Sequence, residues 1–169
     1  GFEAYIVGGC VRDFLLEKEP EDWDVTTNAK PEEIQKVFPD SFYENNFLTV
    51  TVRIAAASRP KGSPGFGEPM EIEITTYRFE AKYSDKRHPD EVKCAEKLED
   101  DLSRRDFTIN AMALDEKIEN RKKKIEVIDN FGGQKDLKDK VIRTVGNPEE
   151  RFNEDALRML RAVRFATTL

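Results

Sequence analysis

Two aspartates one residue apart, Asp22 and Asp24, follow a glycine pair at Gly8 and Gly9 in this chain of 169 residues. In an extended strand, side chains alternate between the two faces, so both carboxylates would point the same way while Trp23 points into the core. Two carboxylates on one face repel each other unless a cation lies between them. Hard oxygen ligands with open positions suit Mg²⁺ when substrate phosphates complete its shell. The pair therefore predicts metal-dependent phosphate chemistry, the alternative being the solvated side of an edge strand.

A third carboxylate is expected on a neighbouring strand. Glu73 lies between two isoleucines, where an unpaired charge would be costly unless a positive group meets it. If that strand lies beside Asp22 and Asp24, the three acids could hold two Mg²⁺ ions about 3.5–4 Å apart. One ion would activate an attacking hydroxyl and the other would neutralise a triphosphate. Glu71 shares the face of Glu73 and is the competing candidate, and a solvent-facing strand acid is the alternative for either.

Composition excludes several other kinds of site. His88 is the only histidine, and Cys10 and Cys94 are the only cysteines. The chain therefore has too few of these residues to favour a zinc site, Ser-His or Cys-His catalysis, or a disulfide framework. The net charge of -6 argues against a simple nucleic-acid coat but does not exclude RNA as a substrate. The sequence has no apolar run of membrane-spanning length, and a cytoplasmic protein without a membrane partner is expected.

The apolar pattern predicts strands alternating with helices in one domain, or in one domain and a fragment of another. Because neither end looks like a natural terminus, we expect a piece of a longer protein. Residues 58–69 are rich in Gly and Pro and predict a loop, and residues 79–96 are charged and aperiodic and predict a mobile segment. Strands are expected at residues 2–7, 23–26, 47–55, 70–77, 111–114 and 125–128, and helices at residues 10–16, 31–38, 98–110, 132–139 and from 153 onward.

Four motifs occur in order: VGGxVRDxLL at residues 7–16, DxDxxT at 22–27, RRDFTINA at 104–111 and EDxxRxxRAxRF at 154–165. They resemble the class II tRNA nucleotidyltransferase and bacterial poly(A) polymerase family of the polymerase β-like nucleotidyltransferase superfamily. The resemblance implies an α+β fold in which residues 1–146 form a catalytic head with a five-stranded mixed sheet and flanking helices. Residues 147–169 would begin a helical neck that recognises the nucleotide, with the body and tail absent.

The resemblance also assigns roles to residues of the first three motifs. Gly8 and Gly9 would lie against the nucleoside triphosphate, and Arg12 would contact it. Arg105 and Asp106 would lie near the phosphates and the ribose, where an aspartate accepting from the 2′-OH would select ribonucleotides. Asp22 and Asp24 would bind Mg²⁺. The alternatives are a plain strand-to-helix turn at the glycines and, for the third motif, a junction held by an internal ion pair.

The last motif is expected to choose the base. Asp155 and Arg158 are three residues apart and would share one helical face, so both could reach one base edge. Arg161 and Arg164 continue this step and are also expected to bind the nucleotide, although the step drifts around the helix. The alternative is an exposed ion pair. The core side of the helix is expected at Leu157, Leu160 and Val163.

The resemblance implies template-independent addition of nucleotides to tRNA 3′ ends, with CTP, ATP and the tRNA 3′ end as partners. Residues 83–89 resemble the flexible loop of enzymes that add C, C and A, which favours full CCA addition. Addition of only CC, addition of only the terminal A, and poly(A) synthesis remain open. A non-catalytic nucleotide sensor is the more remote alternative.

Overall fold

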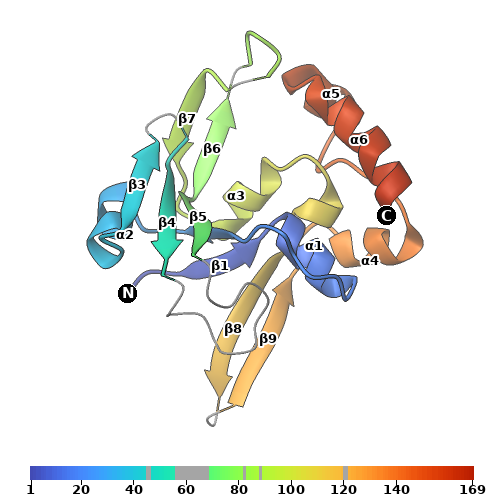
Figure 1. Cartoon of the computed structure of the whole chain (residues 1–169). Helices are drawn as coiled ribbons and strands as arrows, with labels where there is room; N and C mark the ends of the chain where they lie inside the picture. The colour runs from blue at the N-terminus through green and yellow to red at the C-terminus, as the bar shows by residue number, and fades with distance from the viewer. Residues whose placement is uncertain (45–46, 56–68, 82, 88, 120–121) are drawn as a thin grey trace.

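The computed structural model describes residues 1–44, 47–55, 69–81, 83–87, 89–119 and 122–169 (Figure 1). Its central sheet has seven strands in the order β3-β4-β5-β2-β1-β8-β9. β2 and β5 run parallel, and the other paired neighbours are antiparallel. The strands are β1 (Ala4–Val7), β2 (Asp24–Thr27), β3 (Ser41–Glu44), β4 (Thr49–Ile54), β5 (Met70–Thr76), β8 (Ala113–Glu119) and β9 (Lys122–Ile128).

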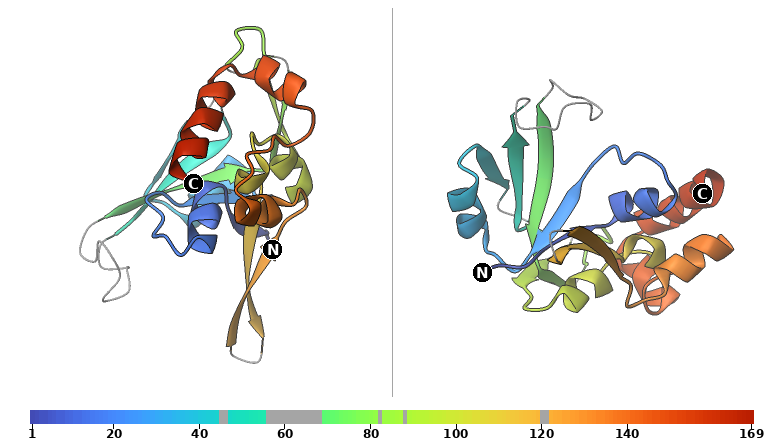
Figure 2. Two further views of the ribbon diagram at one scale, coloured as in Figure 1. Left: turned by 90° about the vertical axis from the view of Figure 1, so that its right-hand side faces the viewer. Right: turned by 90° about the horizontal axis from the view of Figure 1, so that it is seen from below.

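The α+β class and the mixed sheet with flanking helices are confirmed, but the sheet has seven strands instead of the expected five. β3 is a four-residue edge strand, too short to show an alternating pattern in the sequence. β8 and β9 are longer than expected and form a hairpin that projects from the body (Figures 1 and 2). Ion pairs such as Lys117–Glu126 at 2.8 Å lie along this hairpin. Its exposed part therefore carries charged residues and lacks the alternation of apolar and polar residues that marks a half-buried strand in a sequence.

Seven helical segments are described, and several begin where the sequence predicts. Pro31 opens α2, and Glu33 Oε2 accepts from the backbone N–H of Lys30 at 2.8 Å, which caps the helix. The helix expected at 98–110 ends at Ser103 because Phe107 is extended before the short 3₁₀ turn begins. The segments are α1 (Gly9–Leu15), α2 (Pro31–Val37), α3 (Leu98–Ser103), the 3₁₀ turn (Thr108–Asn110), α4 (Gly133–Asp139), α5 (Pro148–Glu154) and α6 (Leu157–Thr168).

The apolar core is divided between the two ends of the sheet. Near β4 and β5, α2 packs Ile34 with Val50 and Val52. Near β1 and β8, α1 packs Val11 against Met112. A further cluster of Phe107, Ile109 and Phe165 joins α6 to the 3₁₀ turn. α6 is therefore seated on the head beside α1 and α4 (Figure 1). No helix in the described ranges is long and apolar enough to span a membrane.

A second, two-stranded sheet lies within the segment expected to be mobile. β6 (Arg78–Ala81) pairs antiparallel with β7 (Glu91–Cys94). The sequence pattern thus failed to show the strands in this segment, and its mobility stays a prediction. Residues 82 and 88 and most of the expected loop at 58–69 lie outside the described ranges.

Partly buried ion pairs hold this hairpin in place. Arg78 Nη2 lies 2.7 Å from Glu80 Oε1, and Arg104 Nη1 lies 2.9 Å from the same oxygen. Arg104 Nη2 also contacts Asp101 Oδ1 at 2.8 Å, and Asp101 is fully buried. Although burial opposes it, Arg104 and Arg78 lower the pKa of Glu80. Charged side chains pair with one another here, and a hydrophobic period cannot reveal such pairing.

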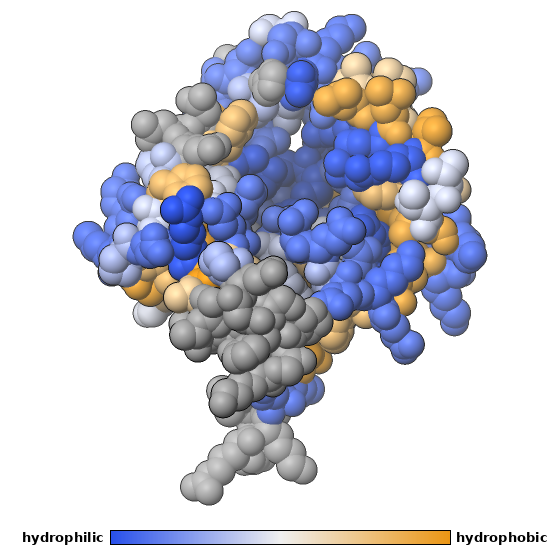
Figure 3. Space-filling model, in the orientation of Figure 1, coloured by the Kyte–Doolittle hydropathy of each residue, from blue (hydrophilic) through white to orange (hydrophobic). Residues whose placement is uncertain are grey.

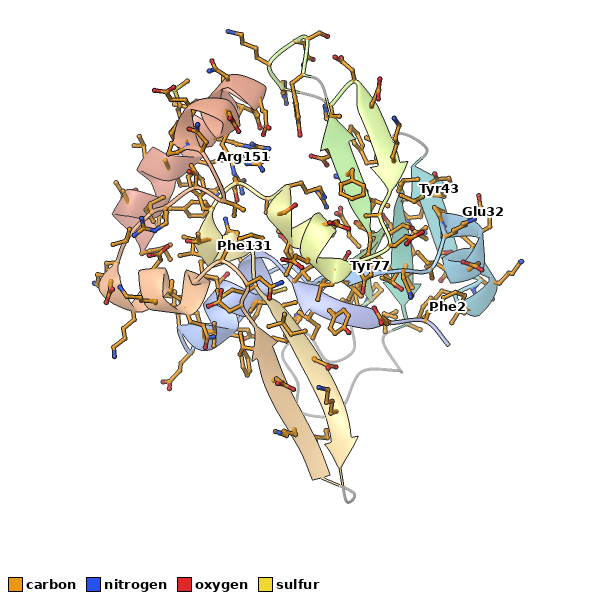
Figure 4. All side chains as sticks on the ribbon, turned by 180° about the vertical axis from the view of Figure 1, so that it is seen from behind. Phe2, Glu32, Tyr43, Tyr77, Phe131 and Arg151 are labelled. Carbon is orange, nitrogen blue, oxygen red and sulfur yellow. The ribbon has the colours of Figure 1, made fainter. Side chains whose placement is uncertain are left out.

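The C-terminal helix expected from residue 153 is two helices. Asn147 caps the first, because its Oδ1 accepts from Glu149 N at 3.0 Å. From α5, Arg151 reaches back to the head, where Nη2 donates to the Ser103 carbonyl at 2.9 Å and Nε donates to the Val145 carbonyl at 2.8 Å (Figure 4).

The expected core side of α6 is wrong, because three apolar residues on this helix are exposed. The exposed fractions are 42% for Leu157, 68% for Leu160 and 64% for Val163. Apolar surface accordingly lies over the C-terminal helices in Figure 3.

Candidate active site

A cavity of about 680 Å³ opens between the start of α1, the segment before β2, the 3₁₀ turn and α6. We call it the site cavity. It brings together acidic and basic residues from all four sequence motifs. Hydrophilic surface lines the hollow in the face shown in Figure 3. The lining residues among the predicted ones are Gly8, Gly9, Arg12, Asp22, Asp24, Arg105, Asp106, Arg161 and Arg164.

The turn between β1 and α1 needs glycine at its first position. Gly8 has φ +83° and ψ -138°, a conformation that side chains disfavour. A Cβ atom at Gly8 would lie 2.9 Å from Arg105 Nη1 and 3.3 Å from Asp24 Oδ2. At Gly9 a Cβ atom would lie 3.6 Å or more from the Arg12 guanidinium, an ordinary contact. Close packing of the first and third motifs therefore depends on Gly8.

The two aspartates face one cavity although only one of them is in a strand. Asp24 begins β2, whereas Asp22 is exposed in the bend before it, so the expected strand alternation does not place them. Burial is the largest cause of the raised pKa of Asp24; the Arg105 guanidinium opposes this shift, and the negative charge of Asp22 adds to it. The two carboxylates thus interact electrostatically, and both line the site cavity.

Glu73 is placed beside Asp24 by strand register. In the parallel β2–β5 pair, Asp24 and Glu73 are direct partners. Glu71 lies opposite Arg53 on β4, and Arg53 Nε donates to Glu71 Oε1 at 3.0 Å. Glu71 is therefore already paired with a cation on the strand away from β2.

The three acids do not form a closed metal cage. Glu73 is absent from the described lining of the site cavity. In the described ranges, no three His, Cys, Asp or Glu side chains are grouped so that they could hold a metal ion. Asp22 and Asp24 together supply hard oxygen donors that face open space, which fits a cation completed by substrate oxygens.

Arg105 is held against Gly8 by a buried carboxylate from α3. Arg105 Nη2 donates to Asp101 Oδ2 at 3.3 Å, and Arg105 Nε is buried without a hydrogen-bond partner among the described residues. The expected alternative, an internal ion pair within the third motif, is not what the structure contains. Asp101 and Glu80 hold Arg104, and Asp106 instead pairs with α6.

Three guanidinium groups lie near the ring of Phe165, a buried residue that lines the site cavity. The distances from the guanidinium carbon to the ring centroid are 5.1 Å for Arg12, 5.4 Å for Arg161 and 5.0 Å for Arg164. Stacking over an aromatic face stabilises a cation and limits its conformations. Phe165 thereby gathers positive charge from the first and last motifs into one place, a suitable arrangement for binding polyphosphate.

Asp155 and Arg158 are not brought together as expected. Asp155 lies between α5 and α6, where its Oδ1 accepts from Leu157 N at 2.9 Å. Arg158 is only 6% exposed; its Nη1 donates to Glu154 Oε2 at 2.5 Å, and its guanidinium lies 5.9 Å from the Tyr83 ring centroid. Neither residue is in the described lining of the site cavity. The shared helical face is wrong because the helix is interrupted at Asp155, and the base-reading role stays a prediction.

Sequence reasoning missed several residues that line the site cavity, and Phe165 and Asn110 are the two with contacts to predicted site residues that matter most here. Phe165 and Asn110 line the cavity, and Asn110 contacts both Arg12 and Asp106. Both lie inside the motifs, but a phenylalanine or asparagine in a helical pattern gives no sign of its neighbours from other segments.

Known proteins resemble this chain over nearly all of its length. The poly A polymerase head domain family matches residues 4–143. The CCA-adding enzyme of Lactobacillus helveticus is 46% identical over 170 residues, which covers 100% of this chain and 38% of that protein. The chain therefore spans less than half the length of this relative.

Solved structures agree with this likeness. The Bacillus stearothermophilus CCA-adding enzyme in complex with CTP is similar with a TM-score of 0.74 and 39% identity, covering 100% of this chain and 36% of that one. A tRNA nucleotidyltransferase complexed with a primer tRNA and an incoming ATP analogue is similar with a TM-score of 0.66 and 35% identity, covering 98% of this chain and 42% of that one.

Proposed function

Because the chain belongs to the poly A polymerase head domain family, we propose that it is the catalytic part of an enzyme that adds C, C and A to tRNA 3′ ends. The substrates are CTP, ATP and the tRNA 3′ end, and no nucleic-acid template is used. The observation that carries this proposal is the site cavity, where Asp22 and Asp24 face guanidinium groups from three motifs. Carboxylates beside a basic pocket are suited to a metal-bound triphosphate.

Membership of a nucleotidyltransferase family implies the use of a divalent metal, and the donor set in this chain fits Mg²⁺. Asp22 and Asp24 would hold it in the proposed two-ion arrangement, with Glu73 as the third catalytic acid. The raised pKa of Asp24 supports this assignment, because burial and Asp22 make its charge costly until a cation compensates it. Bound Mg²⁺ would neutralise the triphosphate and activate the attacking hydroxyl.

The chain's own residues orient the nucleotide. The turn at Gly8 and Gly9 leaves room for a phosphate to approach the backbone. Arg12 and Arg105 supply charge for the phosphates, and Arg161 and Arg164 extend this charge along α6. Asp106 would accept from the ribose 2′-OH.

Domain boundaries and base choice are part of the same proposal. Residues 1–146 would be the catalytic head, and residues 147–169 would begin the neck of a longer enzyme whose remaining parts hold tRNA. The helix cap at Asn147 supports this boundary. Asp155 and Arg158 would read the base after a rearrangement of the α5–α6 junction. A cytoplasmic location stays a prediction.

The test is extension of a tRNA that lacks its 3′ CCA by the full-length enzyme, with sequencing of the products. We expect addition of C, C and A with Mg²⁺, followed by arrest. Long A tails would indicate a poly(A) polymerase, and addition of CC or of A alone would indicate a partial enzyme. Absence of pyrophosphate release with every nucleotide would refute catalysis and favour a sensor.

A matched pair of charge removals connects the activity to the site. Asp22→Ala should abolish extension without unfolding the protein, because it removes a carboxylate that repels Asp24 in the metal-free state. Glu32→Ala removes the same charge from the exposed surface of α2, away from the site cavity (Figure 4), and should extend tRNA as the wild type does. Activity of Asp22→Ala near that of the wild type would contradict the proposed metal site.

A further inference from the structure

A buried carboxamide connects the first and third motifs at the edge of the site cavity. Asn110 ends the 3₁₀ turn and is 5% exposed. Its Oδ1 accepts from Arg12 Nη1 at 2.7 Å, and its Nδ2 donates to Asp106 Oδ1 at 3.1 Å. We infer that Asn110 is a positioning residue that directs the Asp106 carboxylate toward the nucleotide ribose and thereby sets the preference for ribonucleotides. This inference rests on the proposed function.

The position calls for a neutral side chain that both accepts and donates. A guanidinium lies on one side of Asn110 and a carboxylate on the other. The carboxamide oxygen meets the donor and the amino group meets the acceptor, whereas the reversed orientation would oppose both partners. An aspartate would still accept from Arg12, but its charge would lie against that of Asp106. The two contacts of Asn110 can therefore be separated by substitution.

The hydrogen bonds of Asp106 leave a defined place for a substrate hydroxyl. Its Oδ1 accepts from Phe107 N at 2.8 Å as well as from Asn110, and its Oδ2 accepts from Arg161 Nε at 2.6 Å. A carboxylate oxygen has about two acceptor positions, so Oδ1 is filled while Oδ2 keeps one. Because Asn110 and Phe107 fix Oδ1, they fix the direction of the remaining position on Oδ2. A ribose 2′-OH in the site cavity could donate there.

The hydrogen bonds of Asn110 and Asp106 also connect an arginine near the start of the chain with one near its end. Arg12 belongs to α1 and Arg161 to α6, and both guanidiniums lie over Phe165. Asn110 and Asp106 form the polar connection between these two arginines. Loss of the donor at Asn110 would leave Phe107 N as the one remaining described donor to Oδ1, so the carboxylate would be less firmly held against turning with Arg161, while Arg12 Nη1 kept its acceptor.

The test compares kcat/KM for CTP and dCTP in tRNA extension by the full-length enzyme. Asn110→Asp should lower the CTP value about ten- to a hundredfold, the worth of one hydrogen bond to a charged group, and leave the dCTP value nearly unchanged. Asn110→Ser introduces no charge and is too short to reach both partners. It should lower both values, because Arg12 Nη1 loses its acceptor while Asp13 still holds Nε and Nη2, and it should lower the CTP to dCTP ratio.

Thr108→Val is the matched control. Thr108 lies in the same 3₁₀ turn and is buried, but its Oγ1 donates to Asp136 Oδ2 at 2.7 Å on the side of α4. It should lower thermal stability and keep the wild-type ratio. If Asn110→Asp does not fold, the Asn110→Ser ratio decides. A wild-type ratio in the folded Asn110 variants would overturn the inference, whereas absence of tRNA extension by the wild type would refute the proposed function itself.

Discussion

Replacing Gly8 by alanine tests whether the close approach of the first and third motifs depends on that residue. The backbone of Gly8, at φ +83° and ψ -138°, is strained for any other residue, at a cost of about 1–3 kcal/mol. For a chain of this size, 1 kcal/mol corresponds to roughly 2–4 °C in Tm, so we expect Tm to fall by roughly 2–12 °C. The new Cβ would also lie 2.9 Å from Arg105 Nη1, so that guanidinium must move.

Gly9→Ala is the natural control, because it adds the same methyl group one residue later. Gly9 opens α1 without a positive φ, and its Cβ would make only ordinary contacts with Arg12. Alanine in a helix is favoured over glycine by roughly 0.5–1 kcal/mol, so Tm should stay the same or rise slightly.

Thermal unfolding followed by circular dichroism gives both Tm values, and titration with CTP gives the effect on the site. We expect Gly8→Ala to lose both stability and CTP affinity. Equal Tm values for Gly8→Ala and the wild type, or a larger loss in Gly9→Ala, would refute this account of the turn. Loss of CTP affinity in Gly9→Ala at unchanged Tm would instead show that phosphate approaches the backbone at Gly9.

Two further predictions concern the acids. Folding raises the pKa of Asp24, so ionisation of this group costs stability as pH rises through the raised value, and this cost is absent below the ordinary carboxyl range. Asp24→Asn should therefore raise the Tm of the metal-free protein at pH 7, and the difference in Tm from the wild type should vanish near about pH 3. The same substitution should lower the rate of tRNA extension by roughly a thousandfold or more. A lower Tm for Asp24→Asn than for the wild type at pH 7 would contradict this account. Glu73→Ala should reduce extension severely and Glu71→Ala only mildly, because Glu73 is the strand partner of Asp24 and Glu71 is paired with Arg53. Steady-state kinetics measures both, and the reverse order would reassign the third acid.

Much of the fold could be predicted from local signals. Proline and acidic residues at its start predict α2, and alternation of apolar residues predicts β4 and β5. β6 and β7 could not be predicted in this way, because the residues that fix them are charges paired with α3. The exposed face at Leu160 and Val163 misled the interpretation of α6, since an apolar stripe does not say whether the described chain covers it.

The sequence predicted most of the residues named for the site, but it did not predict how their side chains are arranged. The motifs supply the acids and arginines of the site cavity, and strand alternation suggests that Asp22 and Asp24 share a face. The structure reaches this result differently, because a bend carries Asp22 to the cavity. Sequence spacing also could not show that Asp155 lies at the break between α5 and α6, or that Arg158 turns to Glu154. Such contacts depend on how segments far apart in the chain meet.

The β6–β7 hairpin is held to α3 by charges, and this constrains how its sequence can change over evolutionary time. Loss of Glu80 alone would leave Arg78 and Arg104 facing each other, and loss of Arg104 alone would leave Glu80 and Asp101 without their shared partner. Breaking one side of a buried ion pair costs about 3–5 kcal/mol, whereas replacing the whole group by apolar residues is often neutral. Single substitutions of Arg78, Glu80 or Arg104 are thus costly while joint ones are permitted, so in related sequences these three positions should be retained together or exchanged together. Asp101 should be retained in either case, because it also pairs with Arg105.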